Sequence, residues 1–331
     1  MKKKILIILV ILLVIVTGCG KKEEPKKEVA KKKEVKQEEK IKVIDTESDS
    51  RPFAVIVNNF PGAVKVQTGL NDAYIVYEFP VEGGMTRSLA LFKDKETSKI
   101  GTVRSARHNF LDYVMENDAI FVHFGWSHYA ESQVSSLGIN NINGLVDSPF
   151  WRENPEGLAT EHTAYTSLVK CKETAKNKGY KLNTSTKVPL NYSVKEVNLS
   201  DGTKADTVNI KYSDVYRLEF KYDSENKIYT RYANGVKHTD YFNKTDFTAK
   251  NILVLTTEFH YTDDNYYLEI KNTGTGSGYY ITNGYAKKIT WSKKDRKSQT
   301  TYKYEDGTEL NINDGNTYIM FRGSSQSLNF N

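Results

Sequence analysis

Cysteine is scarce in this sequence, with two residues among 331. They are Cys19, close to the N-terminus, and Cys171, in a stretch of helical pattern. Because we expect Cys19 to be modified, no disulfide within the chain is available, and the fold must be stabilised by core packing. We interpret Cys171 as a buried small hydrophobic residue rather than a nucleophile.

The N-terminal apolar run is too short to cross a membrane. A spanning helix needs about 20 apolar residues, whereas this run extends from Ile5 to Val16 and follows the basic segment Lys2–Lys4. That pattern is typical of a secretory signal peptide. We therefore predict a signal peptide over residues 1–18.

The run ends in Val16-Thr17-Gly18-Cys19, which resembles the lipobox of bacterial lipoproteins. The resemblance implies cleavage after Gly18 and lipidation of Cys19; the alternative is an uncleaved anchor with a chance cysteine. Several acyl chains hold a protein on a bilayer, since each buried CH₂ contributes about 0.8 kcal/mol. We expect a protein anchored by lipid in the cell membrane, at its extracytoplasmic face.

The chain has little net charge outside its N-terminal region. Residues 20–42 contain ten lysines and six glutamates but few large apolar side chains, so we predict a solvated tether over residues 19–44. Because the signal segment carries +3 and residues 20–42 carry +4 of the total +6, residues 43–331 carry −1. A nearly neutral folded part excludes the basic surface that nucleic acid requires, so no nucleic-acid partner is expected.

Residues 45–182 combine strand and helix patterns. The run from Pro52 to Asn58 is apolar and rich in β-branched residues, as in a strand buried on both faces. Residues 73–79 and 85–92 flank Gly83-Gly84 and are predicted to form a hairpin, and residues 100–103 and 118–125 are predicted as strands. Shorter helices are predicted over residues 129–137 and up to about residue 178, the latter capped by Thr163 or Thr166.

The main candidate for ligand binding is an arginine pair beside a predicted helix. Ser105 is expected to cap a helix over residues 106–117, with Arg104 and Arg107 on either side of the cap. Free backbone N–H groups, the helix dipole and two guanidinium groups together favour an anion. The other candidate ligand-binding residues are Arg87, His128, His162 and Tyr165.

The same region contains candidates for catalysis, although the sequence does not decide whether the protein is an enzyme. Glu78 and Glu82 resemble the paired carboxylates of glycoside cleavage, and His123 is a candidate to assist them. Structural pairing of at least one glutamate with Arg87, Arg104 or Arg107 is the favoured alternative. Histidines 123, 128 and 162 with Asp112 or Asp118 match no metal-ligand spacing, so neither a metal nor another cofactor is assigned.

Residues 183–331 have the pattern of a mostly antiparallel β domain. Strands are predicted over residues 216–222, 228–232, 252–256, 266–270, 278–282, 286–291, 300–304 and 317–321. Turns are predicted at Asn234-Gly235, Gly274–Gly278, Asn283-Gly284, Asp306-Gly307 and Asp314-Gly315. The numerous tyrosines are predicted to pack on the sheets, with a face for stacking sugars or peptides as the alternative. The expected fold class is therefore α+β, a mixed sheet followed by antiparallel strands.

Several segments of this chain resemble the YerB family of lipoproteins, which consists of DUF3048 N-terminal and C-terminal domains. The resemblance is carried by residues 51–55, 73–78, 81–87, 100–107, 118–123 and 162–166, and by Gly274–Gly278, Asn283-Gly284 and residues 289–293. It implies the two-part layout and the surface location, but no catalytic assignment. The family tends to show His-Asn-Leu-Tyr where this chain has His162-Thr-Ala-Tyr165.

Three functions remain open from the sequence. The leading hypothesis is an extracytoplasmic protein that binds or regulates cell-wall components, such as a peptidoglycan carboxylate or a wall-polymer phosphate, through the arginine-flanked site. The second is a peptidoglycan glycosidase or lytic transglycosylase that uses Glu82 or Glu78 as its general acid. The third is a scaffold whose tyrosine-rich β domain binds a membrane-bound wall enzyme. Oligomeric state is not indicated by the sequence.

Overall fold

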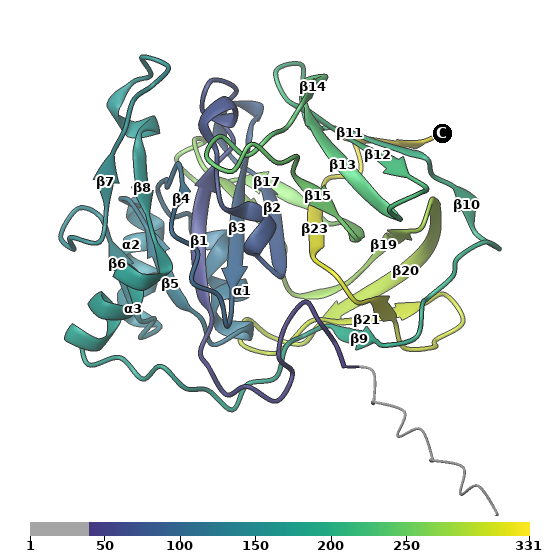
Figure 1. The fold of residues 1–331 in the computed structure, drawn as a ribbon, viewed down its shortest axis with the longest axis horizontal. Coiled ribbons are helices and arrows are strands. Elements are labelled where there is room, and N and C mark those ends of the chain that lie inside the picture. The colour runs from purple at the N-terminus through teal and green to yellow at the C-terminus, as the bar shows by residue number, and fades with distance from the viewer. Residues whose placement is uncertain (1–39) are drawn as a thin grey trace, which may run out of the picture. The chain divides into compact units, whose positions relative to one another are not determined.

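One large mixed sheet organises the residues that the structure describes, which are 40–331 in this computed structural model (Figure 1). Its strand order is β10-β20-β19-β16-β23-β2-β3-β1-β5-β6, and β21 pairs with β20. The strands are β1 (Phe53–Asn58), β2 (Ile75–Pro80), β3 (Thr86–Phe92), β5 (Ile120–His123), β6 (Asn141–Asn143), β10 (Thr203–Lys204), β16 (Asn251–Thr256), β19 (Gly274–Thr282), β20 (Tyr285–Lys293), β21 (Thr301–Tyr304) and β23 (Thr317–Arg322).

A second sheet stands beside the half of the main sheet that contains β19 and β20 (Figure 1). Its strands are β11 (Thr207–Lys211), β12 (Arg217–Asp223), β13 (Ile228–Ala233), β14 (Val236–Lys237), β15 (Thr248–Ala249) and β24 (Ser327–Phe330). Three small sheets are formed by β4 (Ile100–Gly101), β7 (Trp151–Arg152) and β8 (Ala164–Thr166), by β9 (Asn191–Ser193) and β22 (Asn311–Asn313), and by β17 (Phe259–Tyr261) and β18 (Leu268–Ile270).

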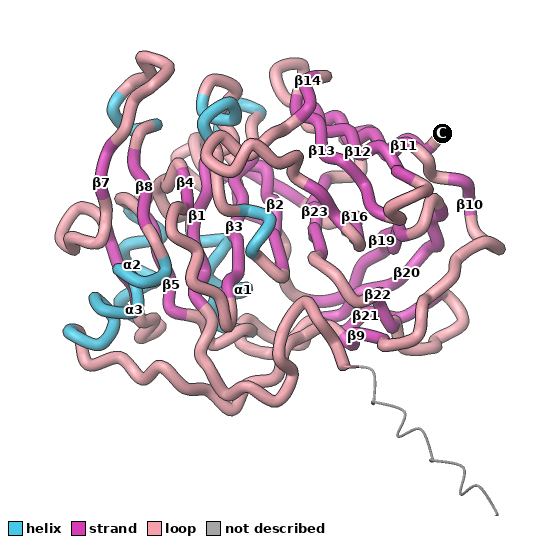
Figure 2. The backbone as a smooth tube through the Cα atoms, in the orientation of Figure 1, coloured by secondary structure: helices cyan, strands magenta, loops and turns pink. Residues whose placement is uncertain are grey.

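Helices are short and few among residues 40–331, as Figure 2 shows. The α-helices are α1 (Leu111–Glu116), α2 (His128–Ser136) and α3 (Leu168–Asn177). The 3-10 helices are η1 (Ala63–Val66), η2 (Leu70–Asp72), η3 (Glu82–Gly84), η4 (His108–Phe110) and η5 (Thr160–His162). This content confirms the α+β class. None of the described helices is long and apolar enough to cross a membrane.

Both faces of the main sheet are buried, which explains its continuous apolar strands. All six residues of β1 are buried, and they alternate between two cores. Val55 and Val57 face the core that contains α3 and the second sheet, whereas Ala54 and Ile56 face the core that contains α1 and α2. Residues 40–331 form one compact unit around these two cores.

The predicted hairpin of residues 73–92 is confirmed, because β2 and β3 pair in antiparallel register on either side of Gly83-Gly84. On its other edge β2 pairs in parallel with β23, close to the C-terminus. Strands from residues 45–182 and from residues 183–331 therefore share one sheet. The division of the sequence at residue 182 stays a prediction.

Three local predictions are wrong. The helix expected over residues 106–117 begins at Leu111 and follows η4. The helix that ends near residue 178 is capped by Ser167, whose side chain accepts from the backbone N–H of Lys170, and neither Thr163 nor Thr166 caps it. Gly274–Gly278 forms the start of strand β19 rather than a turn.

The glycine-rich segment becomes a strand because of its neighbours across the sheet. A Cβ at Gly276 would lie 2.4 Å from Nε1 of Trp291, so the missing side chain makes room for the indole. A Cβ at Gly278 would lie 2.6 Å from the carbonyl oxygen of Val254 on β16. Glycine inside a strand marks such close approaches. In a sequence, a cluster of glycines indicates a turn. The contacts of these glycines with Trp291 and Val254 could not be predicted from the sequence pattern.

Candidate functional site

Three arginines lie together at one end of the hairpin of β2 and β3. We call Arg87, Arg104 and Arg107 the arginine cluster; Arg87 is on β3, and the other two lie between β4 and η4. Arg87 and Arg107 are buried, with 7% and 9% of their surface exposed, and Arg104 is half-buried. Guanidinium groups held this far from water need anionic or carbonyl partners.

The two buried arginines bind to Glu82 and to two backbone carbonyl groups, those of Ser105 and Ala106. Arg107 donates from Nε to Oε1 of Glu82 at 2.5 Å and from Nη2 to Oε2 at 3.0 Å, a bidentate ion pair. Arg87 donates from Nη1 to the carbonyl oxygen of Ser105 at 2.6 Å, and its Nη2 is 3.9 Å from Oε2 of Glu82. One carboxylate is thus shared by two guanidinium groups.

Arg104 stands apart from this network. Within residues 40–331 its side chain forms no ion pair and no hydrogen bond. Burial lowers its pKa, the nearby Glu161 carboxylate opposes that shift, and the positive charge of Arg107 adds to it. Burial and the charge of Arg107 also hold the pKa of Arg87 well below its ordinary value. An anion placed among the three would relieve this repulsion.

The helix start predicted at Ser105 is absent. The arginine cluster is therefore formed by side chains and not around a helix end. Residues 103–107 are extended, and their backbone N–H groups pair with neighbouring segments: Val103 with the carbonyl oxygen of Ala164, Arg104 with that of Ile56, and Ala106 with that of Gly125. Ser105 therefore caps no helix, and the prediction of an anion at a helix start is wrong. Without the helix start, the prediction that Arg104 and Arg107 lie in one site depends only on the arginine cluster.

Glu78 lies away from the surface. Its side chain is fully buried, its Oε2 is 3.0 Å from Nη2 of Arg231, and Thr86 donates to its Oε1 at 2.5 Å. Tyr216 donates to the same Oε1 at 3.4 Å. A general acid must reach a substrate proton, which an enclosed, ion-paired carboxylate does not do. The structural alternative for Glu78 is favoured, with Arg231 as the partner that sequence reasoning missed.

His123 is likewise part of the core. Its Nδ1 is 2.8 Å from the carbonyl oxygen of Gly125, and its Nε2 is 3.3 Å from Oδ1 of Asn141. Burial lowers the pKa of His123 to about 4, so the ring is neutral near pH 7. With no exposed surface, the imidazole packs between Phe121 and Trp126.

His162 borders the arginine cluster, whereas Tyr165 does not. His162 stacks on Phe60 with ring centroids 4.3 Å apart, and Nδ2 of Asn58 donates to its Nδ1 at 2.8 Å. Burial, and then the charge of Arg104, lowers the pKa of His162. Tyr165 is buried on β8, where its hydroxyl donates to the carbonyl oxygen of Val66 at 2.9 Å.

His128 belongs to a group of rings that the sequence analysis did not assemble. We call His128, Tyr129, Tyr266 and Tyr267 the aromatic patch. His128 and Tyr129 begin α2, and the two tyrosines lie in the loop between β17 and β18. Tyr267 contacts His128 and Tyr129 with centroids 5.5 and 5.8 Å apart. The adjacent tyrosines after Asp263-Asp264-Asn265 were a visible signal, but their proximity to α2 was not.

The structure does not gather the metal candidates. Across residues 40–331, no three His, Cys, Asp or Glu side chains lie close enough to hold a metal ion. Asp112 is paired with Arg296 at 2.6 Å and Asp118 with Arg51 at 2.9 Å, so both carboxylates belong to ion pairs rather than to a group with the histidines.

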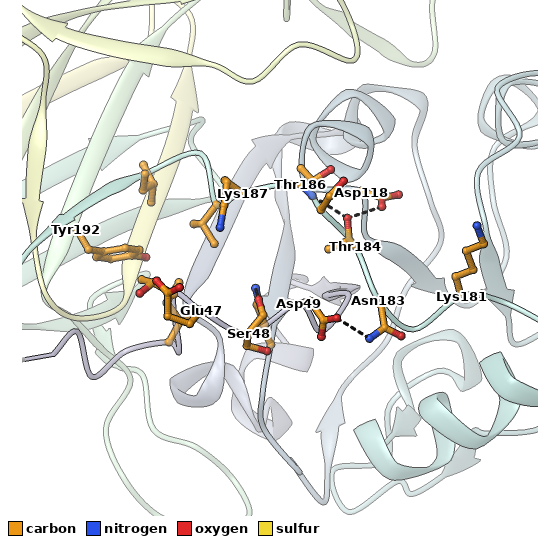
Figure 3. Close-up of a pocket in the computed structure, with 16 residues that line it drawn as sticks. Glu47, Ser48, Asp49, Asp118, Lys181, Asn183, Thr184, Thr186, Lys187 and Tyr192 are labelled. Atoms are coloured by element: carbon orange, nitrogen blue, oxygen red, sulfur yellow. Dashed lines mark hydrogen bonds between the residues drawn. The ribbon is translucent and has the colours of Figure 1, made fainter.

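A large cavity of about 800 Å³ lies elsewhere, between residues 44–49 and 181–192 (Figure 3). Asp49 accepts from Nδ2 of Asn183 at 3.0 Å, and Thr184 donates to Asp118 at 2.7 Å, as the dashed lines in Figure 3 indicate. Its lining contains acidic residues 47, 49 and 118 and lysines 93, 181 and 187, so the cavity favours neither anionic nor cationic ligands. The arginine cluster therefore remains the candidate site.

Comparisons with known proteins bear on the whole chain. The family described as "Protein of unknown function (DUF3048) N-terminal domain" matches residues 41–181, and its C-terminal domain matches residues 208–319. The putative lipoprotein YerB of Bacillus subtilis (strain 168) is 32% identical over 288 residues, 86% of this chain and 83% of that protein. A crystal structure of the YerB protein from Bacillus subtilis has a TM-score of 0.75 at 31% identity and covers 85% of this chain and 94% of that one.

Proposed function

Because this chain belongs to the DUF3048 family, the family of YerB, we propose that it is a membrane-anchored lipoprotein that binds an anionic component of the cell envelope at its arginine cluster. The proposal has two parts, the anchor and the ligand. They rest on different observations and are tested separately.

The anchor is supported by the N-terminal sequence and by the relative. Residues 1–18 have the pattern of a signal peptide, and Gly18-Cys19 has that of a lipobox, although these residues lie outside the part that the structure describes. The similar protein of Bacillus subtilis is named a putative lipoprotein. Export by a signal peptide places the folded part on the extracytoplasmic side of the membrane, where wall polymers are the abundant anions.

The half-buried guanidinium group of Arg104 is the observation that carries the ligand proposal. It has no partner among the described residues. The positive charge of Arg107 helps to lower the pKa of Arg104, and the charge of Arg104 helps to lower that of Arg87. Proteins pair a buried charge with an opposite one. A carboxylate of a peptidoglycan peptide or a phosphate of a wall polymer would supply the missing negative charge, with two oxygens that arginine can bind in a bidentate pair.

Retention on isolated cell wall tests the ligand. We expect purified residues 40–331 to be retained, and Arg104→Ala to weaken retention by about tenfold, because a hydrogen bond between charged groups contributes about 1.5–3 kcal/mol. Arg217→Ala is the matched control, since Arg217 is an exposed arginine on β12, outside the cluster. Equal retention of wild type, Arg104→Ala and Arg217→Ala would contradict the proposal.

Membrane fractionation tests the anchor. The full chain is expected in the membrane fraction, and Cys19→Ala in the soluble fraction, with incorporation of labelled fatty acid lost in the variant. Recovery of the wild-type protein from the cytosol would overturn both the anchor and the assignment of wall material as ligand.

A further inference from the structure

The arginine cluster and the aromatic patch join at Tyr267. The guanidinium carbon of Arg107 lies 5.1 Å from the centroid of the Tyr267 ring, within the distance of a cation–π contact. Tyr267 comes from the loop between β17 and β18, more than 150 residues further along the chain. The loop therefore brings aromatic rings to the edge of the anion site.

The patch presents ring surface to solvent beside those arginines. Tyr266 contacts Tyr267 with centroids 4.8 Å apart and has 60% of its surface exposed. His128 stacks against Tyr129 with centroids 4.1 Å apart, and 62% of its side chain is exposed. Tyr266 reaches the cluster through Tyr267, the ring that lies against Arg107. Exposed rings beside a charged cluster offer one ligand both an apolar and a charged contact.

Acidic neighbours of the site are held by other groups. Glu82 is bound to Arg107. Asp264 accepts from Oγ1 of Thr262 at 2.5 Å and from the backbone N–H of Tyr266 at 3.0 Å, and its Oδ2 is 3.8 Å from Nε2 of His128. Glu161, the carboxylate that acts on Arg104, is the exception: it is bound to no other group among the described residues, but it is exposed to solvent, where its charge is screened.

The charges in the cluster favour a doubly charged ligand. Arg87 and Arg107 share the carboxylate of Glu82, whose side chain is 13% exposed, and Arg104 has no ion pair among the described residues, so three positive charges face one paired carboxylate. A phosphate monoester carries about −1.5 to −2 near pH 7 and three strong acceptor oxygens, whereas a carboxylate carries one charge. Arginine forms bidentate pairs with phosphate.

We infer that the ligand of this site is a phosphorylated saccharide, with its phosphate at Arg104 and its sugar ring on Tyr266. This inference rests on the anion binding proposed above and specifies the ligand. Tyrosine suits a sugar because its ring covers the apolar C–H face while its hydroxyl bonds to polar groups. Because Tyr266 adjoins Tyr267, whose ring lies against Arg107, one molecule of that size can contact the rings and the arginine cluster together.

The experiment compares three small ligands by isothermal titration calorimetry, using residues 40–331, which form a compact unit with their own cores. The probes are inorganic phosphate, glucose 1-phosphate and methyl α-glucoside. The variants are Arg104→Ala and Tyr266→Ala, with Tyr261→Ala as a matched control, because Tyr261 lies on the same hairpin and is also 60% exposed.

Glucose 1-phosphate is expected to bind more tightly than inorganic phosphate, and methyl α-glucoside more weakly than either. Tyr266→Ala should weaken the binding of glucose 1-phosphate by about tenfold, because one ring contact is lost, and should leave the affinity for inorganic phosphate unchanged. Arg104→Ala should weaken the binding of both phosphates, whereas Tyr261→Ala should weaken the binding of neither.

Each other outcome is decisive. If the two phosphates bind equally, or if Tyr266→Ala keeps the wild-type affinity for glucose 1-phosphate, the inference of a saccharide ligand is wrong. The proposed anion site would be unaffected. If neither phosphate binds while wall retention still depends on Arg104, the ligand is a carboxylate and this inference is wrong. If neither phosphate binds and retention does not depend on Arg104, both proposals fail.

Discussion

Arg231 Nη2 lies 3.0 Å from Oε2 of Glu78, and both side chains are buried. Glu78 is on β2 of the main sheet and Arg231 is on β13 of the second sheet, so the pair joins the two sheets through their common core. Tyr216 accepts from Arg231 at 3.2 Å, and Thr86 donates to Glu78 at 2.5 Å. These partners satisfy both Glu78 oxygens and Nη2 of Arg231, whereas Nε of Arg231 has no partner among the described residues.

Breaking this pair is expected to destabilise the fold strongly. Glu78→Gln leaves the guanidinium group of Arg231 buried without a counterion, which costs about 3 to 5 kcal/mol. Urea unfolding of wild type and variant measures the difference. The control is Glu258→Gln, which breaks the exposed pair of Glu258 and Lys271 and should change stability by less than about 1 kcal/mol. Similar losses in the two variants would contradict the role of the buried pair.

The buried imidazole of His123 predicts a loss of stability in acid. Burial lowers its folded-state pKa to about 4, below the ordinary 6.5, so the unfolded chain binds a proton more readily. The stabilisation is complete above about pH 6.5 and decreases as the pH falls toward 4; between pH 7 and 5 the loss is about 2 kcal/mol.

Replacement of His123 measures that contribution. In His123→Asn the amide nitrogen takes the place of Nδ1, so unfolding free energies should fall less between pH 7 and 5, by about 2 kcal/mol, than in wild type. His128→Gln, at an exposed histidine, should keep the wild-type slope. A slope unchanged in His123→Asn would show that the proton is taken up elsewhere.

Cys171 is expected to be inert in the folded protein. Its thiol is fully buried on α3, and burial raises its pKa to about 12, although the nearby Thr166 hydroxyl opposes the shift. At pH 8 only about one molecule in 10⁴ carries the thiolate, the form that reacts with disulfide reagents. Residues 40–331 contain no other cysteine. DTNB should therefore label these residues in urea but not in buffer, and rapid labelling of the native protein would contradict this burial.

Gly276 should not tolerate a side chain. In Gly276→Val the new Cβ would meet the Trp291 indole, which now donates from Nε1 to the carbonyl oxygen of Thr256 at 3.2 Å. Displacing a packed ring of this kind costs about 1 to 3 kcal/mol. Ser277→Val, at the exposed neighbouring position, should change stability by less than about 0.5 kcal/mol. Thermal or urea unfolding of the two variants provides the comparison.

Local patterns predicted the elements whose cause is local. Asn234-Gly235 and Asn283-Gly284 form the expected two-residue turns, with positive φ at both positions, because asparagine and glycine adopt that conformation readily. The alternating run of β12 and the continuous apolar run of β1 are likewise strands as predicted. By contrast, Ser105 has the sequence of a helix cap, yet backbone pairing of its neighbours with other segments keeps it extended.

Partners distant in sequence could not be predicted. At least one of Glu78 and Glu82 was expected to pair with an arginine of its own region, and Glu82 does so with Arg107. The partner of Glu78, Arg231, is 153 residues away. The arginine cluster was partly visible, because Arg87, Arg104 and Arg107 lie within a short stretch. The aromatic patch could not be predicted, because its residues Tyr266 and Tyr267 are far in sequence from the arginines and are brought close to them only by the tertiary structure. A single sequence contains the residues of such a contact but not their distance.

The place of β23 in the main sheet also bears on synthesis and export. This strand, Thr317–Arg322, lies between β16 and β2, with four strands beyond β2 formed by earlier residues. A growing chain cannot complete the sheet until those last residues have left the ribosome. The order of translation therefore delays completion of the sheet to its final moments. Such a delay would suit a chain that crosses a membrane unfolded, as the proposed export requires.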